Sequence, residues 1–173
     1  MEGAFLIPAA VFVACLGMRN MYELLKESRK ITAQNRAAFV VVFLSMCALW
    51  VCWFILCPAD PYRVEVPGPV RGIALTLVGG GTVLAVGALL QLRGVENIEH
   101  LVTRGLFRRV RHPMYCGFVA WILGWGIYHG ALAGLGIGAL GIASIVWWRH
   151  LEDARLEMQF GSRYREYRNS TWF

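Results

Sequence analysis

The chain alternates long uncharged, mostly apolar runs with short segments rich in arginine and lysine. The uncharged runs are residues 3–18, 37–59, 72–92 and 114–148, with lengths of 16, 23, 21 and 35 residues. A helix needs about 20 apolar residues to cross a bilayer. Charged residues make up 16% of the chain, against about 25% in an ordinary soluble domain. The pattern excludes a soluble globular fold and predicts an all-α integral membrane protein, one domain over residues 1–173.

The last uncharged run is too long for one transmembrane helix. Its 35 residues have Gly130 near their midpoint, and glycine interrupts helices. We therefore expect two short helices that form a tight C-terminal hairpin. The five expected spans are residues 3–18, 37–59, 72–92, 113–128 and 131–148, followed by a cytoplasmic helix at 149–168.

The positive charges predict how the chain is oriented in the membrane. Segments 19–36, 93–111 and 149–173 lie on one side of a five-span chain and carry 5 Lys or Arg residues each, whereas the other side has only Arg63 and Arg71. Basic residues concentrate in cytoplasmic loops. We expect the N-terminus outside and the C-terminus in the cytoplasm, at the plasma membrane of a prokaryote or the endoplasmic reticulum of a eukaryote. Topology and anionic membrane lipids account for the basic charge, so no nucleic-acid partner is expected.

Cysteines and glycines add two expectations. None of the five cysteines forms a CxxC pair or lies beside a histidine that would complete a metal site, so no metal is expected. Gly130, Gly134 and Gly138 form a stripe with a spacing of four residues. Such stripes let helix backbones approach closely in lipid, which predicts tight packing around the hairpin.

Two polar segments flank the hairpin, so it must return them to the same membrane face. The first, residues 99–117, holds several arginines around His112 and Pro113. Pro113 suits the first turn of a helix, and the free N–H groups of that turn would bind an anion beside His112. Tyr115 follows three residues after His112 and would lie near the same face.

The second polar segment, residues 149–173, is expected to continue the last span as a helix. Glu152 and Asp153 are the first carboxylates after 35 uncharged residues. As ordinary helical features they would form ion pairs, Arg149 with Asp153 and Arg155 with Glu152. Beside the basic residues of the first segment, Glu152 would instead hold the cationic end of a zwitterion whose carboxylate lies at the helix start.

The two polar segments resemble sequence motifs of a known protein family. The run Arg111-His112-Pro113-Met114-Tyr115-Cys116-Gly117 resembles the Arg-His-Pro-x-Tyr-x-Gly motif of the integral-membrane methyltransferases that include isoprenylcysteine carboxyl methyltransferase and the phospholipid N-methyltransferases. The lead-in at 101–105 is similar to theirs. So is the downstream order of Glu152 and Asp153, Leu156, Phe160-Gly161, Tyr164 and Tyr167, and the resemblance extends over residues 99–173.

The resemblance implies methyl transfer that depends on S-adenosylmethionine, leaves S-adenosylhomocysteine and takes place at a cytoplasmic cofactor pocket. The implied acceptor is lipid-like or prenylated and arrives within the membrane. The implied catalytic residues are Glu152 and Arg149. Glu152 would bind the cofactor's amino group or its reacting end, and Arg149 would bind an acceptor carboxylate. The implied cofactor-binding residues are His100, Val102, Gly105, Arg111, His112, Pro113, Tyr115, Gly117 and Glu152.

Several functions stay open at this point. A prenylcysteine-like carboxylate is the favoured acceptor, because it arrives ionised and needs no base. A phospholipid amine, the second choice, must lose a proton, and Glu152 or His112 would then be the base. A membrane reductase of the sterol reductase kind, which uses NADPH, is similar in architecture. A non-enzymatic helical partner protein would need only the glycine stripes.

Overall fold

The computed structural model describes residues 2–31, 35–92 and 100–173. These residues form six α-helices and one short 3-10 helix, η1. In chain order they are α1 (Glu2–Glu27), α2 (Arg36–Leu56), α3 (Gly68–Leu92), η1 (Gly105–Arg108), α4 (Pro113–His129), α5 (Leu132–Phe160) and α6 (Ser162–Ser170). The β-type pairings in the described ranges are two isolated bridges, Arg63 with Ala131 and Val110 with Trp172. The all-α prediction is confirmed.

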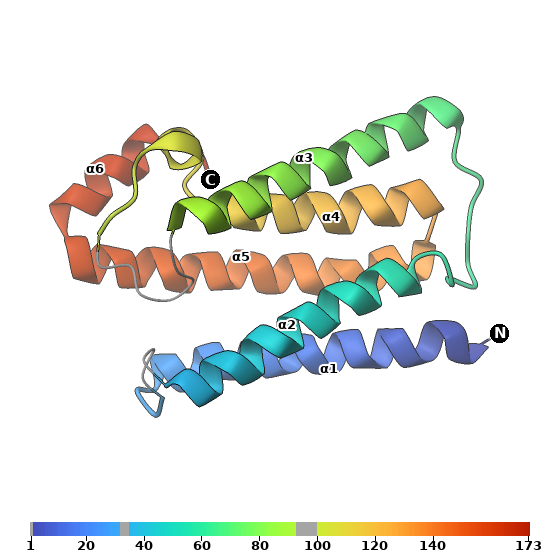
Figure 1. Ribbon diagram of the computed structural model, residues 1–173, viewed down its shortest axis with the longest axis horizontal. Helices are drawn as coiled ribbons and strands as arrows, with labels where there is room; N and C mark the ends of the chain where they lie inside the picture. The colour runs from blue at the N-terminus through green and yellow to red at the C-terminus, as the bar shows by residue number, and fades with distance from the viewer. Residues whose placement is uncertain (1, 32–34, 93–99) are drawn as a thin grey trace.

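The long helices form a bundle in which α5 lies between two helix pairs (Figure 1). α1 packs against α2, α3 packs against α4, and α5 contacts both α1 and α4. One end of the bundle carries η1, α6 and the last residues of the chain, while the other end carries the N-terminus (Figure 1). The core between the helices includes the buried side chains Phe12, Leu49, Trp53, Ile122 and Ile145.

Four of the described helices are long and apolar enough to cross a membrane, namely Gly3–Glu27, Arg36–Leu56, Gly68–Leu92 and Leu132–Phe160. α4 is shorter, with 17 residues, and lies beside α3 and α5. Lipid offers no hydrogen-bond partner to the backbone, so continuous helices are the structure that such apolar runs must take.

The hairpin between α4 and α5 turns where the sequence predicts it. α4 ends at His129, and Gly130 takes a left-handed conformation with φ of 62°. The N-terminus of α5 is capped from a distance by Asp60, which lies in the loop after α2. One oxygen of its carboxylate accepts the Gly134 N–H at 2.6 Å, and the other accepts the Tyr62 N–H at 2.7 Å. The buried carboxylate thus satisfies one N–H group in the first turn of α5 that lacks an intrahelical partner and one in the loop after α2.

The first helix extends well beyond the expected span at 3–18. α1 continues to Glu27, and Arg19, Glu23 and Lys26 within this extension form ion pairs. Arg19 and Glu23 form an i,i+4 ion pair on α1, and Arg155 of α5 donates to the same Glu23 carboxylate. The expected pairing of Arg155 with Glu152 is therefore wrong, because α1 brings Glu23 against α5.

The last helix is also divided differently from the expectation. Instead of a single helix over 149–168, α5 continues to Phe160 and a separate helix, α6, begins at Ser162. Gly161 lies between them with φ of 58° and ψ of −130°, a backbone conformation that suits glycine. α6 consequently turns back toward η1 and α4 (Figure 1).

Candidate active site

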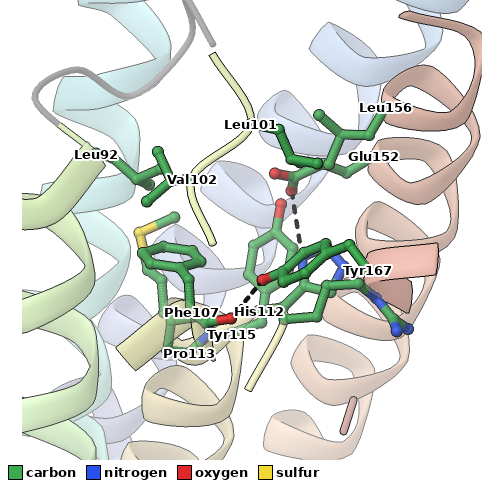
Figure 2. A pocket seen from close by; sticks show the side chains of 12 residues that line it. Leu92, Leu101, Val102, Phe107, His112, Pro113, Tyr115, Glu152, Leu156 and Tyr167 are labelled. Carbon is green, nitrogen blue, oxygen red and sulfur yellow. Dashed lines mark hydrogen bonds and ion pairs between the residues drawn. The ribbon is translucent and has the colours of Figure 1, made fainter. Parts of the chain in front are cut away.

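A small cavity lies where the loop before α4, the start of α4 and the half of α5 nearer α6 meet, and Figure 2 shows its walls. Its volume is about 40 Å³. The residues that line it are Leu92, Leu101, Val102, Phe107, Arg111, His112, Pro113, Met114, Tyr115, Glu152, Leu156 and Tyr167. The hairpin thus brings the Arg-His-Pro motif and the acidic pair to the same place, as the sequence predicts.

Arg111 and Asp153 form the ionic centre of this region. Arg111 Nε lies 3.1 Å from Asp153 Oδ1, and Arg111 Nη2 lies 3.3 Å from Oδ2, a bidentate arrangement. The third guanidinium nitrogen donates to the Arg168 carbonyl at 3.2 Å. The side chains are only 6% and 13% exposed. Bidentate charge-assisted bonds are among the stronger hydrogen bonds in proteins, so this pair fixes the motif onto α5 and α6.

His112 is oriented by the same aspartate. Its Nε2 lies 2.7 Å from Asp153 Oδ1, and its Nδ1 lies 3.9 Å from Glu152 Oε2. The ring stacks on Tyr115 with 5.5 Å between the ring centroids, which confirms that these two residues share a face. Because an aspartate accepts hydrogen bonds, Nε2 carries the proton and Nδ1 is the nitrogen directed toward Glu152. Pro113 follows as the first residue of α4.

α6 closes the site with two buried tyrosines. Tyr164 donates its hydroxyl to Asp153, and Tyr167 donates to the Phe107 carbonyl at 2.7 Å. Burial, followed by the bond to Asp153, raises the pKa of Tyr164 well above its usual range. Burial also raises the pKa of Tyr167 to about 12. Both hydroxyls therefore remain hydrogen-bond donors throughout the physiological pH range.

The last residues run alongside the motif and hold its backbone. The N–H groups of Arg111 and His112 donate to the carbonyls of Trp172 and Phe173 at 3.0 and 3.1 Å. In return, the Trp172 N–H donates to the Arg109 carbonyl at 2.8 Å. The Arg149 guanidinium lies over the Phe173 ring, 4.7 Å from its centroid. This segment therefore supports the motif from the side away from the cavity.

Glu152 occupies the junction between the small cavity and a second, larger one. Its side chain is 31% exposed, and the Tyr115 hydroxyl points toward its carboxylate (Figure 2). The residues common to both linings are Leu92, Met114, Tyr115, Glu152 and Leu156. A group held at Glu152 would face both cavities.

The larger cavity, of about 450 Å³, is lined mostly by apolar and aromatic side chains from α2, α3 and α4. Trp50 of α2 packs on Phe118 and Trp121 of α4, with centroid distances of 4.8 and 4.9 Å. Phe43 of α2 and Val86 of α3 line the cavity and are about half exposed on the bundle surface. The cavity therefore reaches the surface that would face lipid, between α2 and α3.

The expected cofactor-binding residues divide into two groups. Six of them line the small cavity, namely Val102, Arg111, His112, Pro113, Tyr115 and Glu152. His100 is exposed, and Gly105 lies against Gln91, whose side chain accepts the Leu106 N–H at 3.0 Å. A Cβ on Gly117 would lie 2.5 Å from the Gly81 carbonyl, so Gly117 allows α3 and α4 to pack closely.

Arg149 lies outside both cavities. Among the described residues it is not one of those that line either space. Its Nε is 3.6 Å from Asp153 Oδ2, the expected i,i+4 ion pair. Arg149 thus contacts Asp153 and Phe173.

Sequence reasoning named Asp153 as the neighbour of Glu152 and as the ion-pair partner of Arg149, yet Asp153 also holds Arg111, His112 and Tyr164 together. The zwitterion argument and the resemblance gave the functional role to its neighbour Glu152 instead. The packing of α6 over Asp153 depends on the chain reversal at Gly161, which helical periodicity does not encode. Nothing in the motif indicates that Glu23 of α1 lies near this region.

Comparison with known proteins shows the family of the chain. The sequence profile of the family described as phospholipid methyltransferase matches residues 70–163, more than half of the chain. The chain belongs to this family, a class of methyltransferases, and its apolar helices make it a multi-pass membrane protein. No solved structure matches.

Two curated relatives narrow the comparison. The chain is 30% identical over 111 residues to "Protein-S-isoprenylcysteine O-methyltransferase A" of Arabidopsis thaliana, a match that covers 57% of this chain and 54% of the relative. It is 38% identical over 80 residues to "Protein-S-isoprenylcysteine O-methyltransferase" of Schizosaccharomyces pombe, covering 42% of this chain and 32% of the relative. The matched part is thus about half of one relative's length and about a third of the other's.

Proposed function

We propose that the protein transfers a methyl group from S-adenosylmethionine to the carboxylate of a prenylcysteine-like acceptor that reaches the site through the membrane. The observation that carries this proposal is the junction at Tyr115 and Glu152. There the small cavity built on the Arg-His-Pro motif, which carries the polar groups of His112 and Glu152, meets a larger apolar cavity that opens between α2 and α3. The printed names of the two relatives support the same acceptor class.

The residues at the small cavity fit the chemistry of the cofactor. Glu152 offers a carboxylate to an ammonium or sulfonium group, and His112 and Tyr115 offer polar atoms and flat ring faces. Ligand pockets usually measure about 300–1,000 Å³, so a cavity of about 40 Å³ must widen to admit a nucleoside. Leu101, Phe107 and Tyr167 lie in its wall, and binding would require these side chains to move outward.

S-adenosylmethionine, when bound, supplies a methyl carbon that forms a bond to an acceptor carboxylate oxygen while its bond to sulfur breaks, which gives an ester and S-adenosylhomocysteine. Glu152 would hold the cationic end of the cofactor at the junction. Asp153 keeps His112 and Arg111 in place, and α6 excludes water from that side. The contribution of the chain is therefore mainly alignment and exclusion of solvent, and no general base is required.

A phospholipid amine is the second candidate acceptor, and the printed description of the matching family favours it. An amine must be deprotonated before it attacks carbon. Glu152 and His112 Nδ1 lie 3.9 Å apart at the junction and are the groups that would take the proton. Family membership favours both acceptors over a reductase or a non-enzymatic partner.

Arg149 keeps a proposed role in acceptor binding only if Phe173 moves. Its guanidinium lies over that ring and beside Asp153. In the structure, Arg149 positions Asp153 through their ion pair. An acceptor carboxylate would contact it only after the segment at 171–173 leaves the motif.

The proposal is tested with lipid-reconstituted protein, methyl-labelled S-adenosylmethionine and a farnesylcysteine acceptor. Labelled lipid-soluble product is expected from the wild-type chain. His112→Ala is expected to give none, because the ring that faces Glu152 is removed, while its helix content remains unchanged by circular dichroism. Full activity of this variant would exclude His112 from the site, and no transfer by the wild type would exclude the proposed function.

We also propose that α4 is a fifth span, so that the chain has its N-terminus outside and α6 in the cytoplasm. The end of the bundle with η1 and α6 supports this orientation because it carries most of the basic residues. Exposed examples there, which anionic lipid head groups would meet, are Arg104, Arg108, Arg109, Arg163 and Arg165.

Protease access tests this topology. Trypsin is expected to cleave at Arg163 and Arg165 when it is added to the cytoplasmic face of sealed vesicles, because both residues are exposed. Vesicles that present the opposite face should protect α6. Cleavage from that opposite face would contradict the five-span orientation.

A further inference from the structure

A hydrogen bond joins two walls of the small cavity, one from η1 and one from α6. The Tyr167 hydroxyl donates to the Phe107 carbonyl at 2.7 Å, and both residues belong to the cavity lining (Figure 2). The two residues are buried, with 9% and 7% of their surface exposed. This bond, the cross-wall bond, is therefore shielded from water, and its loss would leave a buried carbonyl without its donor.

The two walls are attached to different helices of the bundle. η1 is attached to α3, because the Leu106 N–H donates to the Gln91 side chain at 3.0 Å. α6 is attached to α5, because the Tyr164 hydroxyl donates to Asp153. The cross-wall bond thus spans the boundary between the α3 side and the α5 side of the cavity.

The small cavity must widen at this boundary to admit a nucleoside. Its volume is about 40 Å³, against about 300–1,000 Å³ in an ordinary ligand pocket. Much of its wall is fixed, because Arg111 and His112 are bonded to α5 and the neighbouring residues belong to α4 and α5. Besides Leu92 at the end of α3, the rest of the wall comes from segment 101–107 and from Tyr167. Widening therefore separates segment 101–107 from α6, and the cross-wall bond breaks.

A second connection between the two walls can persist while the cavity opens. The Trp172 N–H donates to the Arg109 carbonyl at 2.8 Å, and the Arg111 N–H donates to the Trp172 carbonyl at 3.0 Å. These residues pair on the side of the motif away from the cavity. The opening is consequently confined to the side where the cross-wall bond lies.

We propose that the Tyr167–Phe107 bond is an autoinhibitory contact, which holds the small cavity closed so that the cofactor binds only after the bond has broken. The inference rests on the proposed function, which assigns this cavity to S-adenosylmethionine. A site that is open for only a fraction of the time binds its ligand with an affinity reduced by that fraction. Loss of the bond should therefore strengthen cofactor binding, whereas loss of a group that contacts the cofactor would weaken it.

Binding of S-adenosylhomocysteine to the protein in nanodiscs tests the inference without turnover. Tyr167→Phe is expected to bind this probe about three- to tenfold more tightly than the wild type in titration calorimetry. The gain should appear in the association rate, followed by stopped-flow tryptophan fluorescence, and the dissociation rate should stay unchanged. Ser170→Ala is the matched control, since it removes a hydrogen bond within α6, from Ser170 Oγ to the Tyr167 carbonyl at 2.8 Å, and should bind like the wild type.

A distance measurement tests the opening with Tyr167 intact. Spin labels are attached at Arg108→Cys on η1 and Glu166→Cys on α6, both of which are exposed positions. The five native cysteines are replaced by alanine. The distance between the labels is expected to lengthen by more than about 2 Å when S-adenosylhomocysteine saturates the protein.

Unchanged or weaker binding by Tyr167→Phe would overturn the inference, and so would a distance between the labels that stays constant when the probe is bound. If neither the wild type nor Tyr167→Phe binds S-adenosylhomocysteine, the proposed function fails together with the inference. A gain in affinity without methyl transfer to any acceptor would overturn the proposed function alone.

Discussion

Glu152→Gln is expected to lower kcat/KM for methyl transfer by about 100- to 1,000-fold. The carboxylate lies at the junction of the two cavities, where it would face both the cofactor and the reacting end of the acceptor. The amide keeps the shape of the side chain but loses the charge. The rate is measured with methyl-labelled cofactor and the reconstituted protein.

The fold should tolerate this change. Glu152 is 31% exposed, and the nearest nitrogen of His112, Nδ1, is 3.9 Å away. Glu157→Gln on the same helix is the matched control, since Glu157 forms a partly exposed pair with Arg168 at 2.8 Å, away from both cavities. Exposed pairs contribute about 0–1 kcal/mol, so this control should retain nearly full activity. Activity of Glu152→Gln within a few-fold of the wild type would remove Glu152 from the site.

Asp153→Asn is expected to destabilise the protein by about 3–5 kcal/mol and to abolish activity. The change leaves the Arg111 guanidinium, which is 6% exposed, without its anionic partner. It also weakens the hydrogen bonds that Asp153 accepts from His112 and Tyr164. Thermal unfolding in detergent measures the effect.

A second variant separates the loss of stability caused by an unpaired buried charge from the loss of catalytic activity. Arg111→Met/Asp153→Met removes both buried charges together, and such replacements often restore stability. This variant should unfold at a higher temperature than Asp153→Asn but remain inactive. If Asp153→Asn unfolds at the wild-type temperature, the Arg111–Asp153 pair does not hold the motif in place.

Much of the helix pattern follows from the sequence because a backbone in lipid must satisfy its own hydrogen bonds, which helices do. The apolar runs at 37–59 and 72–92 correspond closely to α2 and α3, and Gly130 marks the turn of the hairpin. The end of α1 was not predictable in this way. Arg19 looks like the end of a span, but it pairs with Glu23, which also pairs with Arg155 of the distant helix α5.

The candidate site was predictable where it depends on the motif itself. His112, Pro113 and Tyr115 lie together because they are the N-cap and the first turn of α4, and the hairpin brings Glu152 to them. Interactions between distant segments were not predictable. The role of Asp153 depends on α6 folding back after Gly161, and Gly117 contacts Gly81 of α3 rather than a cavity.

Product analysis under competition tests the central claim most directly. Wild-type protein in a bilayer that contains both a farnesylcysteine and phosphatidylethanolamine is given methyl-labelled S-adenosylmethionine, and the labelled lipid is then treated with alkali. Label that alkali releases is a methyl ester and is the predicted result. Label that survives alkali and is found on phosphatidylethanolamine would contradict the carboxylate acceptor and identify an amine methyltransferase.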